Sequence, residues 1–105
     1  MNVDVQRRDG TAVLSLSGEL DLASAPRLDE ALFECEDGAP TILLDLRGLT
    51  FMDSSGLRVI LAADARARSR GGRLMLVPGP PSVQRVFQLT LLDTRLEFVD
   101  DASAV

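Results

Sequence analysis

The chain has 105 residues, of which 46% are hydrophobic and 26% charged, and its formal net charge is −5. This length fits one domain with one core, and the acidic balance argues against a nucleic-acid binder, which needs a basic face for phosphate groups. With no His and a single Cys, the chain lacks the usual residues for zinc sites and for Ser-His or Cys-His catalysis. We therefore expect neither an enzyme nor a site for a metal or cofactor.

Two further features of the sequence concern location. No apolar run approaches the roughly 20 residues that span a bilayer. The start of the chain also lacks the basic and then apolar pattern of a secretory signal segment. We expect a cytoplasmic protein that contacts neither membrane nor nucleic acid directly.

The first elements expected along the chain are two strands, residues 3–8 and 12–17. Both alternate apolar and polar side chains, and the pair Asp9 and Gly10 separates them. An Asp-Gly pair between two such runs predicts an antiparallel β-hairpin. The next segment, residues 18–21, is expected to form a loop that leads into a helix.

The expected first helix has Ser24 and Pro26 near its start and carries one apolar stripe. The stripe consists of residues at helical spacing, namely Leu28, Ala31, Leu32 and Cys35. Gly and Pro should end the helix near residues 38–40. Because Cys35 lies on the apolar stripe, we interpret it as a packing residue and not as a reactive thiol.

The second half of the chain alternates strands and helices. Residues 41–46 are apolar almost throughout, which is typical of a central strand covered on both faces. The remaining elements are expected as a helix over 55–70, a strand over 73–77, a helix starting at 80–82 and a strand over 96–99. The sequence therefore predicts a single-domain α/β fold over residues 1–105, with a mixed β-sheet, an opening antiparallel hairpin and helices packed on the sheet.

Two expectations concern the ends of elements. Arg66, Arg68 and Arg70 are spaced so that they spread around the end of the second helix, and we expect this end to be solvated. The last residues, 100–105, are expected to fray.

The most informative stretch, residues 46–61, places Ser54 and Ser55 where the second helix should begin. Considered alone, Asp53 or Ser54 is explained as a helix N-cap, which is worth about 1 kcal/mol. A serine hydroxyl at a helix entrance is also a possible site of modification. The residues by themselves leave both interpretations open.

Three motifs together resemble the anti-sigma factor antagonists of the STAS domain family. They are Gly-Glu-Leu-Asp at 18–21, Leu-Asp-Leu at 44–46 and Phe-Met-Asp-Ser-Ser-Gly-Leu at 51–57. The resemblance covers nearly the whole chain and implies a STAS-like fold. It also implies that the protein binds an anti-sigma factor serine kinase, frees a sigma factor, and is inactivated when the kinase phosphorylates Ser54. Ser55 is the rival acceptor, and a PP2C-type serine phosphatase would restore the hydroxyl.

The effect of such a phosphate follows from its charge. A seryl phosphate adds about −1.5 to −2 charge and three strong acceptor oxygens. Beside Asp53 in an acidic chain, it should repel an acidic partner surface and crowd a close interface. The unmodified protein should therefore bind its partner and the modified protein should release it.

The predicted partner-binding residues come from the motif at 18–21, from the serine-bearing motif at 51–57 and from Arg58, which follows it. They are Gly18, Glu19, Leu20, Asp21, Phe51, Met52, Asp53, Ser54, Ser55, Gly56 and Arg58. Several of them have a structural alternative: Gly18 and Asp21 as turn residues, Phe51 and Met52 as core residues. Gly56 either gives an incoming active site room or avoids a clash with the sheet.

A second function fits the same fold. The chain could be a non-phosphorylated STAS subunit of a larger assembly, such as a lipid-transport ABC complex or a stress-sensing scaffold. The serine pair favours the antagonist, because a transport subunit needs no phosphorylatable hydroxyl.

Overall fold

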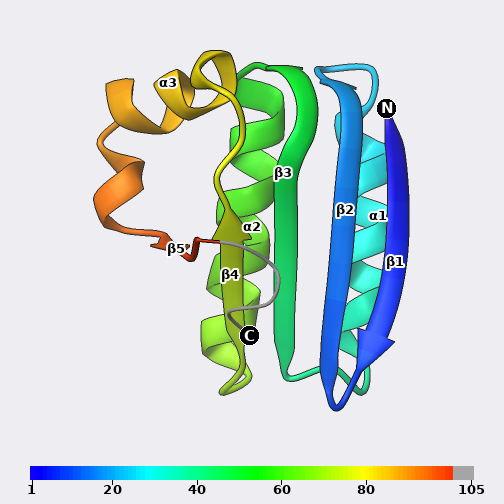
Figure 1. Cartoon of the computed structure of the whole chain (residues 1–105). Coiled ribbons are helices and arrows are strands. Elements are labelled where there is room, and N and C mark those ends of the chain that lie inside the picture. Colours follow the sequence, from blue (N-terminus) through cyan, green and yellow to red (C-terminus); the bar gives the residue numbers. More distant parts are fainter. Residues whose placement is uncertain (101–105) are drawn as a thin grey trace.

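The computed structural model describes residues 1–100, so the expectation of a frayed end falls almost entirely outside the described residues. The chain opens with β1 (Asn2–Arg8) and β2 (Thr11–Leu20), which pair antiparallel (Figure 1). Asp9 and Gly10 connect them with φ angles of 47° and 81°. Two positive φ angles in a two-residue loop match the right-handed twist of the strands, so the predicted hairpin is confirmed.

The sheet has five strands in the order β1-β2-β3-β4-β5. The later strands are β3 (Thr41–Met52), β4 (Arg73–Val77) and β5 (Glu97–Phe98), and each pairs in parallel with the strand before it. Together with the antiparallel hairpin, these pairings confirm the prediction of a mixed sheet in an α/β fold.

The helices occupy one side and one end of the sheet. Figure 1 shows α1 (Ala25–Glu36) and α2 (Ser54–Ser69) side by side behind the strands, and α3 (Pro81–Leu89) at the upper end. A short 3-10 helix, η1 (Leu92–Thr94), leads from α3 toward β5. This arrangement places one helical layer on one face of the sheet.

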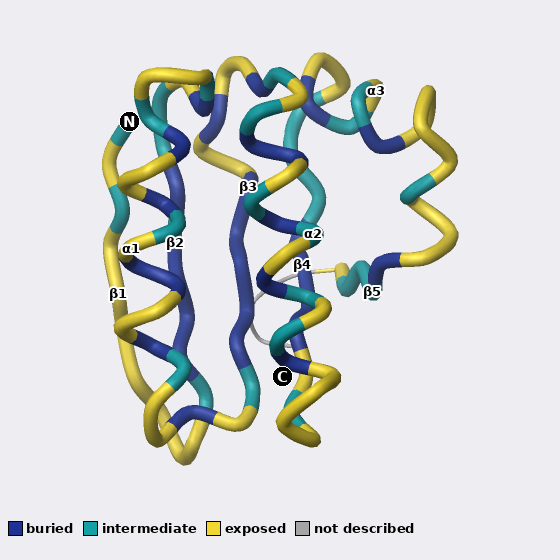
Figure 2. Tube along the Cα trace, turned by 180° about the vertical axis from the view of Figure 1, so that it is seen from behind, coloured by how far each residue is buried: buried dark blue, intermediate teal, exposed yellow. Residues whose placement is uncertain are grey.

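The main core lies between the sheet and α1 and α2, where the buried stripes of both helices face the strands (Figure 2). Leu14, Leu44 and Ile60 are completely buried in it. Cys35 is 2% exposed in the same cluster, and burial raises the pKa of its thiol. The interpretation of Cys35 as a packing residue is confirmed.

A smaller apolar cluster occupies the opposite face of the sheet. It consists of Val13, Leu43, Met75 and Val77. Beside it, the Arg47 guanidinium lies 2.8 Å from the carboxylate of Asp45, and its hydrogen bonds hold the pKa of that carboxyl below its usual range. The central strand β3 is thus buried on both faces, as predicted, with helices on one face only.

The two longest strands extend beyond their predicted ends. β3 continues from the predicted end at Leu46 to Met52, and β2 continues through residues 18–20, which were expected to be a loop. The apolar pattern of β3 breaks at Arg47 and Gly48 because the pairing with β2 is irregular there, with register shifts after Ser15 and after Gly18. Irregular pairing interrupts the period of two without ending the strand.

The expectation of a solvated end of α2 is wrong for Arg66. Its Nε lies 2.6 Å from the Glu36 carboxylate, and its guanidinium carbon lies 3.9 Å from the ring centre of Phe33. Both partners belong to α1, so Arg66 connects the two helices. Arg68 and Arg70 are exposed, as expected, although Arg68 pairs with Asp64 of its own helix.

Two negative observations apply to residues 1–100. None of their helices is long and apolar enough to cross a membrane. No group of three or more His, Cys, Asp or Glu side chains among them is arranged to hold a metal ion.

Candidate functional site

The two motifs of the sequence meet where β2 and β3 end. In the parallel pairing, Glu19 lies opposite Phe51 and Leu20 lies opposite Met52. The backbone N–H of Asp53 then donates to the Leu20 carbonyl at 3.1 Å. Segments about thirty residues apart in the chain therefore form one end of the sheet, shown at the top of Figure 1.

Asp53 directly follows β3 and is the N-cap of α2. Its Oδ1 accepts a hydrogen bond of 2.8 Å from the backbone N–H of Ser55, which satisfies one of the free donors of the first helical turn. Ser54 is the first residue of the helix and is exposed, whereas Ser55 is half-buried. Of the two adjacent serines, Ser54 is the more exposed.

Asp53→Ala is expected to lower the free energy of unfolding by about 1 kcal/mol, because the first turn of α2 loses its cap. Asp53→Asn should retain most of this stability, since an amide oxygen also accepts the hydrogen bond from Ser55. Urea unfolding followed by circular dichroism measures both changes. If Asp53→Ala were as stable as the unmodified protein, the contribution of this cap would be refuted.

Three of the predicted partner-binding residues lie beneath the surface. Leu20 is 0% exposed and Met52 2% exposed. Gly56 is buried above them, and a Cβ at that position would lie 2.5 Å from Cγ of Leu20. The side chains of Leu20 and Met52 belong to the core, and together with the close approach of Gly56 they hold the start of α2 against the sheet, so none of the three offers an exposed side chain at this end. For Gly56, avoiding a clash is a sufficient structural reason.

The turn after β2 is fixed by Asp21 and Ser24. The Asp21 backbone N–H donates to Ser24 Oγ at 2.9 Å, and the Ser24 backbone N–H donates to Asp21 Oδ1 at 3.0 Å. Hydrogen bonds from the backbone N–H and the hydroxyl of Ser24 to the Asp21 carboxylate lower the pKa of Asp21. Gly18 has a φ of 91° at the end of the strand. The turn interpretation is therefore supported for Asp21, whereas Gly18 lies within β2 at the register shift that precedes the exposed Glu19.

Two large apolar side chains are exposed at the site, and only one of them was among the predicted partner-binding residues. Phe51 is 45% exposed although it lies in a strand, and Leu22, which was not singled out, is 76% exposed. A shallow cleft between α1 and α2 begins at this position. Its lining consists of Leu22, Ala25, Pro26, Asp29, Ser55, Arg58 and Val59. The sequence feature that could have identified Leu22 as a site residue is its position directly after the Gly-Glu-Leu-Asp motif.

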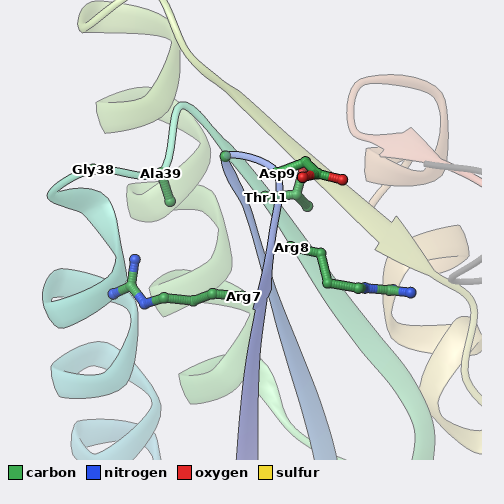
Figure 3. A pocket seen from close by; sticks show the side chains of 7 residues that line it. Arg7, Arg8, Asp9, Thr11, Gly38 and Ala39 are labelled. Carbon is green, nitrogen blue, oxygen red and sulfur yellow. The ribbon is translucent and has the colours of Figure 1, made fainter.

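A second hollow lies at the other end of the sheet, next to the β1–β2 hairpin (Figure 3). Arg7, Arg8 and Asp9 line it together with residues that follow α1. The long side chains of Arg7 and Arg8 extend in opposite directions. None of the residues predicted to bind a partner lines this hollow, so it is separate from the serine-bearing end.

Comparison with known proteins gives a consistent result. A family model described as the STAS domain matches residues 2–103. The anti-sigma-B factor antagonist of Bacillus subtilis (strain 168) is 30% identical over 90 residues, which cover 86% of this chain and 83% of that protein. An anti-sigma factor antagonist from Mycobacterium paratuberculosis superposes with a TM-score of 0.88 at 29% identity, covering 98% of this chain and 88% of that one. The anti-sigma factor antagonist SpoIIAA in its unphosphorylated form superposes with a TM-score of 0.83 at 25% identity, covering 98% and 92%.

Proposed function

This chain belongs to the STAS domain family, and on that basis we propose that it is an anti-sigma factor antagonist switched by phosphorylation of Ser54. In the unmodified state it binds an anti-sigma factor that is also a serine kinase, and a sigma factor is freed. Phosphorylation of Ser54 makes it release the kinase. Its role is regulatory binding, with the kinase as the enzyme of the pair.

The position of Ser54 carries this proposal. Ser54 is exposed, it begins α2, and it lies at the end of the sheet where both motifs meet. The names of the relatives support the same function, since the Bacillus subtilis protein is an anti-sigma-B factor antagonist and the SpoIIAA structure is of an unphosphorylated form.

The location of Ser54 also explains how a phosphate acts without unfolding the domain. The first backbone N–H groups of a helix lack internal partners and tolerate an anion. The phosphate therefore changes what docks on this end of the molecule. It adds about −1.5 to −2 charge next to Asp53 and near the exposed Glu19. An acidic partner surface is repelled by this cluster.

The partner surface in this proposal combines the exposed residues around the acceptor. Phe51 and Leu22 provide apolar area, and Glu19, Ser54 and Arg58 provide polar and charged groups. Exposed apolar area with a polar rim is typical of protein interaction sites. A PP2C-type serine phosphatase completes the cycle, because the hydroxyl must be restored before the protein binds again.

The direct test is incubation of the protein with its anti-sigma factor kinase and ATP, followed by peptide mass spectrometry. We expect one phosphate, on Ser54. Ser54→Ala should accept none, whereas Ser55→Ala should still be phosphorylated. A phosphate on Ser55, or none anywhere, would overturn the assignment.

The relatives' names favour the antagonist over a STAS subunit of a lipid-transport ABC complex or a stress-sensing scaffold. Affinity capture with the unmodified protein separates the two functions. A soluble kinase that responds to ATP is expected, whereas a membrane ATPase would support the transport subunit.

A further inference from the structure

Arg58 lies one helical turn after Ser54 on α2, and both side chains are exposed. Residues four apart on a helix are neighbours, with Cβ atoms about 5–6 Å from each other. A phosphate on Ser54 therefore lies within reach of a guanidinium at position 58, which can donate two parallel hydrogen bonds to phosphate oxygens.

The Arg58 guanidinium is available for such a contact. Within residues 1–100, none of the ion pairs of the structure includes it. Asp29 lines the same cleft as Arg58 but lies 3.8 Å from Arg66. The Asp53 carboxylate accepts the N–H of Ser55. These two carboxylates thus have other partners, and Arg58 is exposed and takes part in no ion pair within residues 1–100.

The location of Arg58 along the helix points the same way. The first turn of α2 contains no acidic residue, and the carboxylate of its N-cap, Asp53, is bonded to the Ser55 N–H. An acidic group that precedes a basic group by four residues on a helix is the favourable order for an ion pair. Phosphorylation of Ser54 provides such an anion at that position.

We propose that Arg58 binds the phosphate of phosphorylated Ser54 within the same helix. The inference rests on the proposed function, since it concerns the modified form of that site. Its consequence is that phosphorylation changes the partner surface twice. It adds a dianion, and it removes the Arg58 guanidinium from the groups that an acidic partner side chain can contact.

The test uses full-length protein with phosphoserine incorporated at position 54 during translation, so that it does not depend on any kinase. Phosphorus NMR then follows the second ionisation of the phosphate against pH in the parent and in Arg58→Gln. A nearby cation favours the dianion, and the second pKa of the phosphate should be lower in the parent by about half a pH unit. Arg58→Lys should recover part of this difference.

The comparison isolates Arg58 from other charges. The neighbouring carboxylates, namely Asp53 at the N-cap of α2, Asp29 on α1, Glu19 on β2 and Asp21 in the turn before α1, are present in every variant, and their effect on the phosphate cancels. Arg8→Gln is the matched control, because Arg8 is exposed at the hairpin end of the sheet, and it should leave the phosphate pKa unchanged. Equal phosphate pKa values in the parent and Arg58→Gln would overturn the inference.

This outcome is independent of the proposed function. If the kinase fails to modify Ser54 while the phosphate pKa still depends on Arg58, the switch is refuted and the contact stands. If Ser54 is modified and the phosphate pKa does not depend on Arg58, the contact is refuted and the switch stands.

Discussion

Ser54→Asp is expected to bind the anti-sigma factor kinase about tenfold or more weakly than the unphosphorylated parent does, whereas Ser54→Ala should bind the kinase as tightly as the parent. Tenfold corresponds to about 1.4 kcal/mol, a modest part of the several kcal/mol that juxtaposed like charges cost at an interface. The effect should be smaller than that of the phosphate itself, because a carboxylate carries one charge and a phosphate about two. Calorimetric titration of the kinase with each variant measures the affinities.

The control for this experiment is the same substitution at the far end of the helix. Ser69 is exposed and is the last residue of α2, so Ser69→Asp adds the same charge away from the proposed surface. It should leave the affinity for the kinase nearly unchanged. Equal affinities of Ser54→Ala and Ser54→Asp would refute the charge mechanism.

Gly56→Val is expected to destabilise the fold by about 2–3 kcal/mol, the cost of overpacking a well-filled site. A Cβ at position 56 would lie 2.5 Å and 2.6 Å from two side-chain carbons of Leu20 and 3.1 Å from Cγ of Met52. The start of α2 must then move away from the sheet, and Ser54 moves with it. Urea unfolding should show the loss of stability, and affinity for the kinase should fall together with it.

The pairing of Gly56 with Leu20 gives this prediction a specific control. Leu20→Ala alone should cost about 2–5 kcal/mol, because Leu20 is completely buried. The double variant Leu20→Ala with Gly56→Val should lose less than the sum, by about 1–2 kcal/mol, since the new side chain occupies the vacated space. Ala65→Val, at an exposed position of the same helix, should cost only about 0.5 kcal/mol through helix propensity. Additive losses in the double variant would show that the clash with Leu20 is not the cause.

Much of the fold was accessible from local patterns. The Asp9-Gly10 turn, the apolar stripe that ends in Cys35 and the apolar run beginning at Thr41 each depend on residues close together in the chain. Period and turn chemistry act at that range, and the structure confirms the corresponding elements. The predicted ends of the strands were wrong where strand pairing continues past a break in the apolar pattern. β3 passes through Arg47 and Gly48 because β2 continues to pair with it across the register shifts.

The candidate site was likewise predicted only in part from the sequence. The sequence pointed to both segments of the site and to the serine pair at a helix start. It could not show that Met52 and Leu20 lie under the surface while Phe51 is exposed, because the register across β2 and β3 decides which face each residue occupies. Nor could it identify Leu22 as an exposed apolar neighbour.

The sequence by itself determined the element order, the hairpin and the helix that begins at the two serines, because these follow from side-chain period, turn residues and capping. Only the tertiary structure decided that the serines' end of β3 lies beside the end of β2 and that Gly56 must be small against Leu20. It also decided that Arg66 joins α1 while Arg58 remains exposed. Such contacts join residues far apart in the chain, and their geometry is set by strand register and helix packing, which local sequence patterns do not specify.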